Sequence, residues 1–118
     1  MCPEDDRNTS LEELKGSVEL FNRERDWVRY HNPRDLAASI SIESAELLEI
    51  FQWKNDEELA GVGQDPEVRE RVKDEVADVV IYLFAMCTRM DIDLSTAIRE
   101  KLKRNERRFP VTGDDAHK

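Results

Sequence analysis

Apolar residues recur along most of this chain at spacings of three and four, which is the pattern of amphipathic helices. No segment sustains the alternation of apolar and polar residues that marks a half-buried strand, so no sheet is predicted. The pattern predicts four helices, at residues 11–29, 33–53, 66–89 and 94–109, with a polar loop around Gly61 and Gly63 after the second. The predicted fold class is all-α.

Residues that favour helix starts stand at the expected places. Ser10 precedes the first helix with a glutamate three residues later, which is the pattern of a capping box. Asn32 and Asp65 are each followed by a proline at the first helical position, where the missing N–H group breaks no hydrogen bond. These signals define the starts of the first three helices.

The length and composition fit one small helical domain. The chain has 118 residues, of which 39% are hydrophobic and 38% charged, with 4 Gly and 4 Pro. We predict a domain at residues 10–110 between flexible polar tails at 1–9 and 111–118. Cys2 and Cys87 do not make a disulfide framework, and no apolar stretch reaches the roughly 18 residues of a membrane span. A cytoplasmic protein is expected.

The formal net charge of −9 limits the partners that this chain can bind. Nucleic-acid polymers and anionic membranes bind basic surfaces, so neither is expected as a partner. A small phosphate ligand is still compatible with an acidic protein when a divalent cation reverses the local charge.

Two pairs of acidic residues carry the clearest chemical signal. Glu43 and Glu46 are three residues apart on the second predicted helix, and Glu75 and Asp78 have the same spacing on the third. Residues three apart share one face of a helix, so two such faces packed together would direct four carboxylates at one point. Carboxylate oxygens are the ligands that Mg²⁺ prefers. The pattern predicts that these four acids hold a divalent cation such as Mg²⁺.

Asp78 stands out because it is the one charged residue between Val76 and Cys87, an apolar run that predicts a buried helix segment. A buried carboxylate is strongly destabilising unless another charge compensates it. Lys73 points off the shared face, and the residues one turn before Asp78 are themselves acidic. A bound divalent cation is the compensation that the pattern favours.

The spacing of the acids is also compatible with proteins of different kinds. Two solvated acidic stripes would need no ligand, and a helical adaptor would have the same amphipathic pattern without a metal. A di-iron bundle also gathers acids from several helices, but it pairs glutamate with a histidine three residues later. His31 and His117 are the only histidines, and neither follows a helical glutamate at that spacing, so the di-iron hypothesis is disfavoured.

The two acidic pairs, with residues 47–74 between them, resemble those of the MazG-like all-α nucleotide pyrophosphohydrolases. Further segments are similar to the deoxycytidine triphosphate pyrophosphatase branch of that superfamily: RDWVRYHNPRDL at 25–36, ELLEIFQWK at 46–54, EVADVVIYLFA at 75–85 and KLKRNERRFP at 101–110. The resemblance covers roughly residues 11–110. It implies an oligomeric MazG-like four-helix bundle.

The resemblance also implies a reaction. Glu43, Glu46, Glu75 and Asp78 would be the catalytic residues and would hold Mg²⁺, or Mn²⁺ in its place. Water would attack the α-phosphorus of a nucleoside triphosphate. The implied substrate is dCTP or a related or modified dNTP, and the products are the monophosphate and pyrophosphate. Family members assemble as homodimers or homotetramers with sites at subunit junctions. The implied nucleoside and phosphate contacts are Trp27, His31, Trp53, Tyr82, Lys101, Asn105 and Arg108.

The same residues admit plainer roles. Trp27 and Trp53 lie at helix ends, where tryptophan also serves packing, and cations near the end of the last helix are favoured by the helix dipole alone. Some members of the pyrimidine-specific branch carry a histidine near the position of Val18, and this departure leaves the base preference open. The alternative to an enzyme is a non-catalytic helical module that binds nucleotides or proteins.

Overall fold

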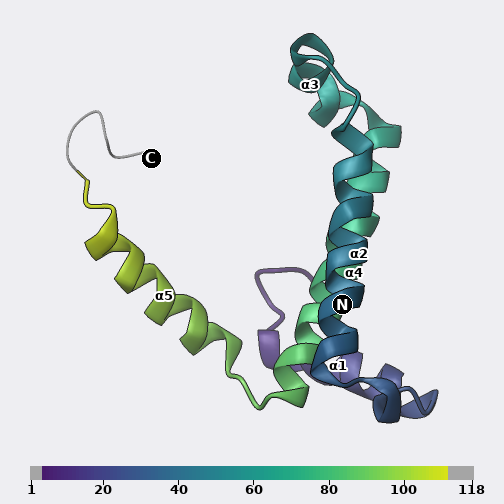
Figure 1. Ribbon diagram of the computed structural model, residues 1–118, viewed down its shortest axis with the longest axis vertical. Helices are drawn as coiled ribbons and strands as arrows, with labels where there is room; N and C mark the ends of the chain where they lie inside the picture. Colours follow the sequence, from purple (N-terminus) through teal and green to yellow (C-terminus); the bar gives the residue numbers. More distant parts are fainter. Residues whose placement is uncertain (1–3, 112–118) are drawn as a thin grey trace.

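The computed structural model describes residues 4–111, and every regular element in that range is a helix (Figure 1). The predicted all-α class is therefore confirmed. None of these helices has both the length and the apolar character needed to cross a membrane. In chain order, with η marking a short 3₁₀ helix, they are α1 (Leu11–Glu24), η1 (Val28–Tyr30), α2 (Pro33–Phe51), α3 (Asp56–Gly61), η2 (Val62–Gln64), α4 (Pro66–Arg89) and α5 (Leu94–Arg108).

The predicted helix starts are confirmed, and a side chain caps each of them. Ser10 Oγ accepts a hydrogen bond from the Glu13 backbone N–H at 3.1 Å, and Asn32 Oδ1 accepts one from the Asp35 N–H at 2.8 Å. Asp65 Oδ1 accepts from two N–H groups in the first turn of α4. Because the first N–H groups of a helix lack partners inside the helix, these caps determine locally where α1, α2 and α4 begin.

The first helix ends earlier than predicted, at Glu24. The Trp27 N–H donates to the Asn22 carbonyl at 2.9 Å, and the Asp26 N–H donates to the Arg23 carbonyl at 3.0 Å. These two bonds form a Schellman motif, in which Asp26 takes the left-handed conformation with φ of 57°. Glycine is the usual residue at that position, and because this chain has an aspartate there, the sequence pattern did not indicate the end of the helix.

A short helix, α3, and the 3₁₀ turn η2 occupy the segment that the sequence pattern predicts to be a polar loop, and that prediction is wrong. Asn55 Oδ1 accepts from the Glu58 N–H at 2.9 Å, and Glu58 Oε1 accepts from the Asn55 N–H at 3.1 Å. This reciprocal capping box starts α3. The two residues carried that signal in the sequence, although the helix they start is only about one and a half turns long.

α2 and α4 lie side by side at the centre of the fold and run antiparallel, with α3 joining them at one end (Figure 1). The predicted antiparallel pairing of the second and third helices is confirmed. α1 packs against α4. Leu36, at 1% exposure, is the most deeply buried of the apolar core side chains, which are Leu36, Ile50, Val68, Phe84, Ala85 and Cys87.

α5 lies apart from the bundle of α1, α2 and α4 within this chain (Figure 1). It follows a second Schellman motif, in which the Ile92 N–H donates to the Cys87 carbonyl at 2.8 Å and Asp91 is left-handed with φ of 54°. The radius of gyration is 17.5 Å, whereas a compact domain of this length has about 13–14 Å. The apolar residues Ile98 and Leu102 of α5 are 45% and 55% exposed, because the other helices in residues 4–111 do not cover this face.

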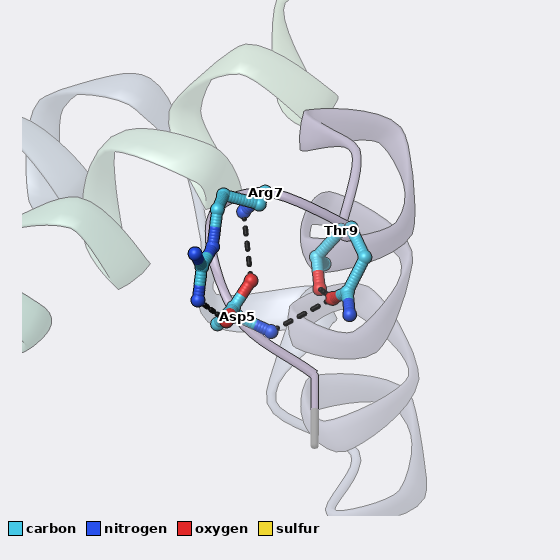
Figure 2. A network of polar contacts seen from close by, with 4 residues as sticks. Asp5, Arg7 and Thr9 are labelled. Carbon is cyan, nitrogen blue, oxygen red and sulfur yellow. Dashed lines mark hydrogen bonds and ion pairs between the residues drawn. The ribbon is translucent and has the colours of Figure 1, made fainter. Parts of the chain in front are cut away.

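Part of the predicted N-terminal tail forms a hydrogen-bonded turn ahead of α1 (Figure 2). The Asp5 N–H donates to Asn8 Oδ1 at 2.8 Å, and the Arg7 N–H donates to Asp5 Oδ1 at 2.9 Å. Arg7 Nη2 also lies 3.1 Å from Asp5 Oδ2. Residues 1–3 and 112–118 lie outside the described residues, and with them Cys2, His117 and most of the predicted C-terminal tail.

Candidate active site

Three of the four predicted acidic ligands meet where α2 lies against α4. One carboxylate oxygen from each of Glu43, Glu75 and Asp78 lies within 4.8 Å of the other two. Glu43 belongs to α2, while Glu75 and Asp78 come from successive turns of α4. Ligands on opposite sides of a Mg²⁺ ion are about 4.2 Å apart, because each lies about 2.1 Å from the metal. The spacing of these oxygens therefore suits a divalent cation.

Two oxygens of this cluster are buried without a partner. Glu43 Oε2 and Glu75 Oε2 are shielded from solvent, and no donor in the described part of the chain hydrogen-bonds to either of them. A buried carboxylate oxygen without a donor or a cation is strongly destabilising. The donor set consists only of carboxylates, which are hard oxygen ligands, so the residues present fit Mg²⁺ or Mn²⁺.

Asp78 itself is exposed, which corrects the expectation that it lies in a buried helix segment. Its neighbours on α4 are open as well, since Val76 and Ile81 are 45% and 41% exposed. The apolar run has the composition of a core segment, but α2 and α1 cover only part of its circumference within one chain. The buried oxygens without a hydrogen-bond partner belong instead to Glu43 and Glu75.

Glu46 is exposed and does not belong to the set of three oxygens, but it adjoins Glu43. The pKa of Glu43 is raised to about 7, with burial as the largest cause. The neighbouring Glu46 and Glu75 carboxyls add to this, because Glu43 can donate a hydrogen bond to either of them only while it keeps its proton. Repulsion from Glu46 and Asp78 raises the pKa further. Glu46, Glu75 and Asp78 thus all raise the pKa of Glu43.

A cavity of about 420 Å³ opens directly beside this acidic cluster. Asp78 belongs both to the cluster and to the cavity wall, so the two features are continuous. Of the predicted nucleoside contacts, three line the cavity: Trp27, His31 and Tyr82. A volume of this size, apolar along most of its wall and charged at one end, suits a small organic ligand that carries an anionic group near a metal.

The turn after α1 positions the aromatic side of the cavity. Trp27 directly follows the left-handed Asp26 and meets the Phe21 ring edge-on, with centroids 5.7 Å apart and an interplanar angle of 70°. The Arg25 guanidinium carbon lies 3.6 Å from the centroid of the Phe21 ring. η1 then carries the chain to His31, at the same cavity. Contacts among neighbouring residues thus hold the tryptophan at the wall.

The remaining predicted contacts do not reach this cavity within the chain. Trp53 lies just beyond the end of α2 and is 86% exposed. Lys101, Asn105 and Arg108 belong to α5, and none of them lines the cavity. Their spacing of four and three residues places all three on one face of that helix.

Sequence reasoning did not single out several residues of the cavity wall. Phe21 and Ile81 have the pattern of ordinary core positions, so no sequence signal marked their role. Asn22 did carry a signal, because its amide falls four residues after Val18, on the otherwise apolar face of the first helix. The missed wall residues are Ser17, Phe21, Asn22 and Ile81.

Comparison with known proteins decides the family. Residues 38–118, more than half of the chain and including both acidic pairs, match the MazG-like family. This chain belongs to the MazG-like family. Members similar to it include human dCTP pyrophosphatase 1, 40% identical over 102 residues, and its bovine counterpart, 39% identical over 102 residues. In both cases the alignment covers 86% of this chain but only 60% of the relative's length.

A solved structure supports the same MazG-like assignment. A pyrophosphatase from Archaeoglobus fulgidus DSM 4304 is 39% identical in sequence and superimposes with a TM-score of 0.77. The match covers 94% of this chain and 99% of that one. The fold of this chain therefore resembles that of a solved pyrophosphatase of nearly the same length.

Proposed function

We propose that this MazG-like chain hydrolyses nucleoside triphosphates, with dCTP or a related or modified dNTP as substrate, to the monophosphate and pyrophosphate. The observation that carries the proposal is the continuity of the cavity with the acidic cluster at Asp78. A nucleoside in the cavity would place its phosphates at the cluster. The similarity to the human and bovine dCTP pyrophosphatases supports the same reaction.

Glu43, Glu46, Glu75 and Asp78 would hold Mg²⁺, with Mn²⁺ as a substitute. Bound there, the cation supplies Lewis-acid activation of phosphoryl oxygens and of water. The oxygen of water bonds to the α-phosphorus, and the bond from that phosphorus to the bridging oxygen breaks. Pyrophosphate leaves with the bonding electrons, while a carboxylate of the cluster accepts the proton that water gives up.

Trp27, His31 and Tyr82 would bind the nucleoside. The exposed face of Trp27 offers a stacking surface for the base, and stacking of this kind tolerates any base. His31 and Tyr82 have polar groups in the cavity wall that can hydrogen-bond the sugar or the base. A nucleoside bound in this way would direct its triphosphate toward Asp78, which lines the same cavity.

We propose that a second copy of the chain completes the site, in a homodimer or homotetramer. Apolar residues of α5 and of the α2–α4 pair, including Ile98, Leu102, Leu48 and Val76, are 45–60% exposed and need cover. The phosphate-binding residues proposed on α5, Lys101, Asn105 and Arg108, stand on a helix that is free to reach a neighbouring copy. Native mass spectrometry at micromolar concentration should find dimers or tetramers, and a monomer alone would overturn this assembly.

The proposed location is the cytoplasm, where reducing conditions keep the buried Cys87 thiol free. Neither a nucleic-acid polymer nor a membrane is proposed as a partner, because the net charge of −9 repels both.

The deciding experiment measures pyrophosphate release from a panel of NTPs and dNTPs in Mg²⁺ or in EDTA. Asp78→Asn should abolish Mg²⁺-dependent release, whereas Asp74→Asn, an equal charge change at an exposed position of the same helix, should not. No release from any nucleotide by folded protein would remove the enzyme and leave a binding role for the same cavity.

A further inference from the structure

Asn22 is the residue of the cavity wall whose chemistry the proposed reaction leaves unused. It is 5% exposed, and among residues 4–111 it is the one polar residue that is buried as a whole. Its backbone carbonyl accepts from the Trp27 N–H, but within residues 4–111 its side-chain amide makes no hydrogen bond. Its amide atoms are not among the fully shielded polar atoms, and the residue lines the cavity, so the little surface it keeps is open to that space. An unpaired amide at a cavity wall is available to hydrogen-bond a ligand there.

The position of Asn22 indicates which part of the ligand it meets. The bond from the Trp27 N–H to the Asn22 carbonyl sets the two residues side by side, and both line the cavity. Asp78 lies in the same wall, at the acidic cluster. A nucleotide with its phosphates at Asp78 and its base against Trp27 therefore presents the edge of that base to Asn22.

An amide offers one acceptor, Oδ1, and one donor group, Nδ2, side by side. Cytosine presents an amino donor next to the ring N3 acceptor, while uracil and thymine present the O4 acceptor next to the N3–H donor. A half turn of the amide exchanges its donor and acceptor. Because no described residue hydrogen-bonds to the amide and fixes it in one orientation, Asn22 can pair with either pattern of donor and acceptor equally well.

We propose that Asn22 reads the base edge of a pyrimidine nucleotide, and that its amide turns over to accept cytosine and uracil or thymine alike. The proposal deepens the proposed function, on which it rests, by naming pyrimidines as the substrate class and Asn22 as the residue that selects them. Each neutral hydrogen bond is worth about threefold to tenfold in affinity. Through Asn22 the site should therefore bind pyrimidines that offer a donor–acceptor pair more tightly than those that lack one. It should discriminate little between cytosine and uracil or thymine.

The test combines a substitution with a change in the base. Wild type and Asn22→Leu, which keeps the side-chain size but removes both polar groups, are compared with dCTP, dTTP and the 2-pyrimidinone deoxynucleoside triphosphate, which lacks the exocyclic group. Binding of the α,β-imido analogues is measured by calorimetry, and pyrophosphate release from the parent nucleotides is measured in parallel. Thermal unfolding of both proteins verifies that the variant is folded.

Wild type should bind the dCTP and dTTP analogues within about tenfold of each other and the 2-pyrimidinone analogue about threefold to tenfold more weakly than dCTP. Asn22→Leu should weaken the binding of the dCTP and dTTP analogues by about tenfold each and leave the ratio of their affinities unchanged. It should also bind the 2-pyrimidinone analogue as tightly as the dCTP analogue. The proposed role of the amide would be overturned if both proteins discriminated equally against the 2-pyrimidinone analogue, or if the variant lost affinity for the dCTP analogue alone. Asn22-dependent binding without any pyrophosphate release would instead overturn the hydrolysis and retain the pyrimidine reading.

Discussion

Replacing Glu75 with glutamine should make the metal-free protein more stable and the magnesium-bound protein less stable. Glu75 contributes one of three carboxylate oxygens within 4.8 Å of one another, and its Oε2 is buried without a partner. Two charges at that separation repel by about 3.5 kcal/mol at an effective dielectric constant of about 20. The substitution removes this repulsion and with it one ligand of the proposed cation.

The net effect of Glu75→Gln on stability is smaller than this repulsion between two full charges. Asp78 is exposed and therefore screened, and Glu43, with a pKa raised to about 7, is only about half charged at neutral pH. The glutamine amide also needs partners. We expect Glu75→Gln to raise the free energy of unfolding in EDTA by about 1–2 kcal/mol, or the melting temperature by about 4–8 °C.

Magnesium should reverse this order. A cation that binds only the folded state adds about 2.7 kcal/mol at a concentration about 100 times its dissociation constant. Wild type should gain this stabilisation, and Glu75→Gln should lose most of it. The assay is thermal and urea unfolding of wild type, Glu75→Gln and the control Asp74→Asn, each in EDTA and in Mg²⁺. A variant that is less stable than wild type in EDTA, or that keeps the full gain in Mg²⁺, would refute the reasoning.

Three further predictions concern single residues. Leu36→Ala should lower the free energy of unfolding by about 2–5 kcal/mol in urea titrations, because Leu36 is 1% exposed in the core; a loss below about 1 kcal/mol would show that the core collapses to fill the space. Asp91→Gly should raise it by about 1 kcal/mol, since Asp91 is left-handed with φ of 54°, and Asp91→Ala should give no such gain. The pKa of Glu43 is raised from 4.5 to about 7, so its contribution to stability is full below pH 4.5 and is lost as the pH rises through 7. In EDTA the melting temperature should fall between pH 5 and 8, and a Glu43→Gln variant with the same slope would contradict this assignment.

The sequence predicted best what neighbouring residues decide. Asn32 and Asp65 cap their helices through bonds to the next few residues, so α2 and α4 begin where the pattern placed them. The convergence of the acidic pairs also follows from helix geometry, because three-residue spacing aligns two side chains on any helix. Local chemistry was missed where its usual residue was absent, as at Asp26, which takes the place of a glycine in the turn that ends α1.

What the sequence did not predict depends on packing between distant segments. The apolar run around Asp78 has the composition of a core helix, but the helices of one chain cover only part of it, and the aspartate stays exposed. The burial of Glu43 and Glu75 depends on how deeply α2 and α4 interlock, which periodicity does not report. The sequence pattern of α5 likewise does not predict its position, because an amphipathic helix has the same pattern whether its apolar face packs against its own chain or against another.

The separation of α5 from the bundle has a consequence for the order of folding. α2, α3 and α4 follow one another along the chain, and the short connection through α3 keeps the loop between α2 and α4 small, so these helices can form a helical hairpin quickly, with α1 closing on α4. α5 gains little from that event because it lies apart from the bundle. Refolding should therefore begin with a fast phase whose rate is independent of protein concentration. In the proposed homo-oligomer, a second phase should follow in which α5 meets another copy, and its rate should rise with concentration.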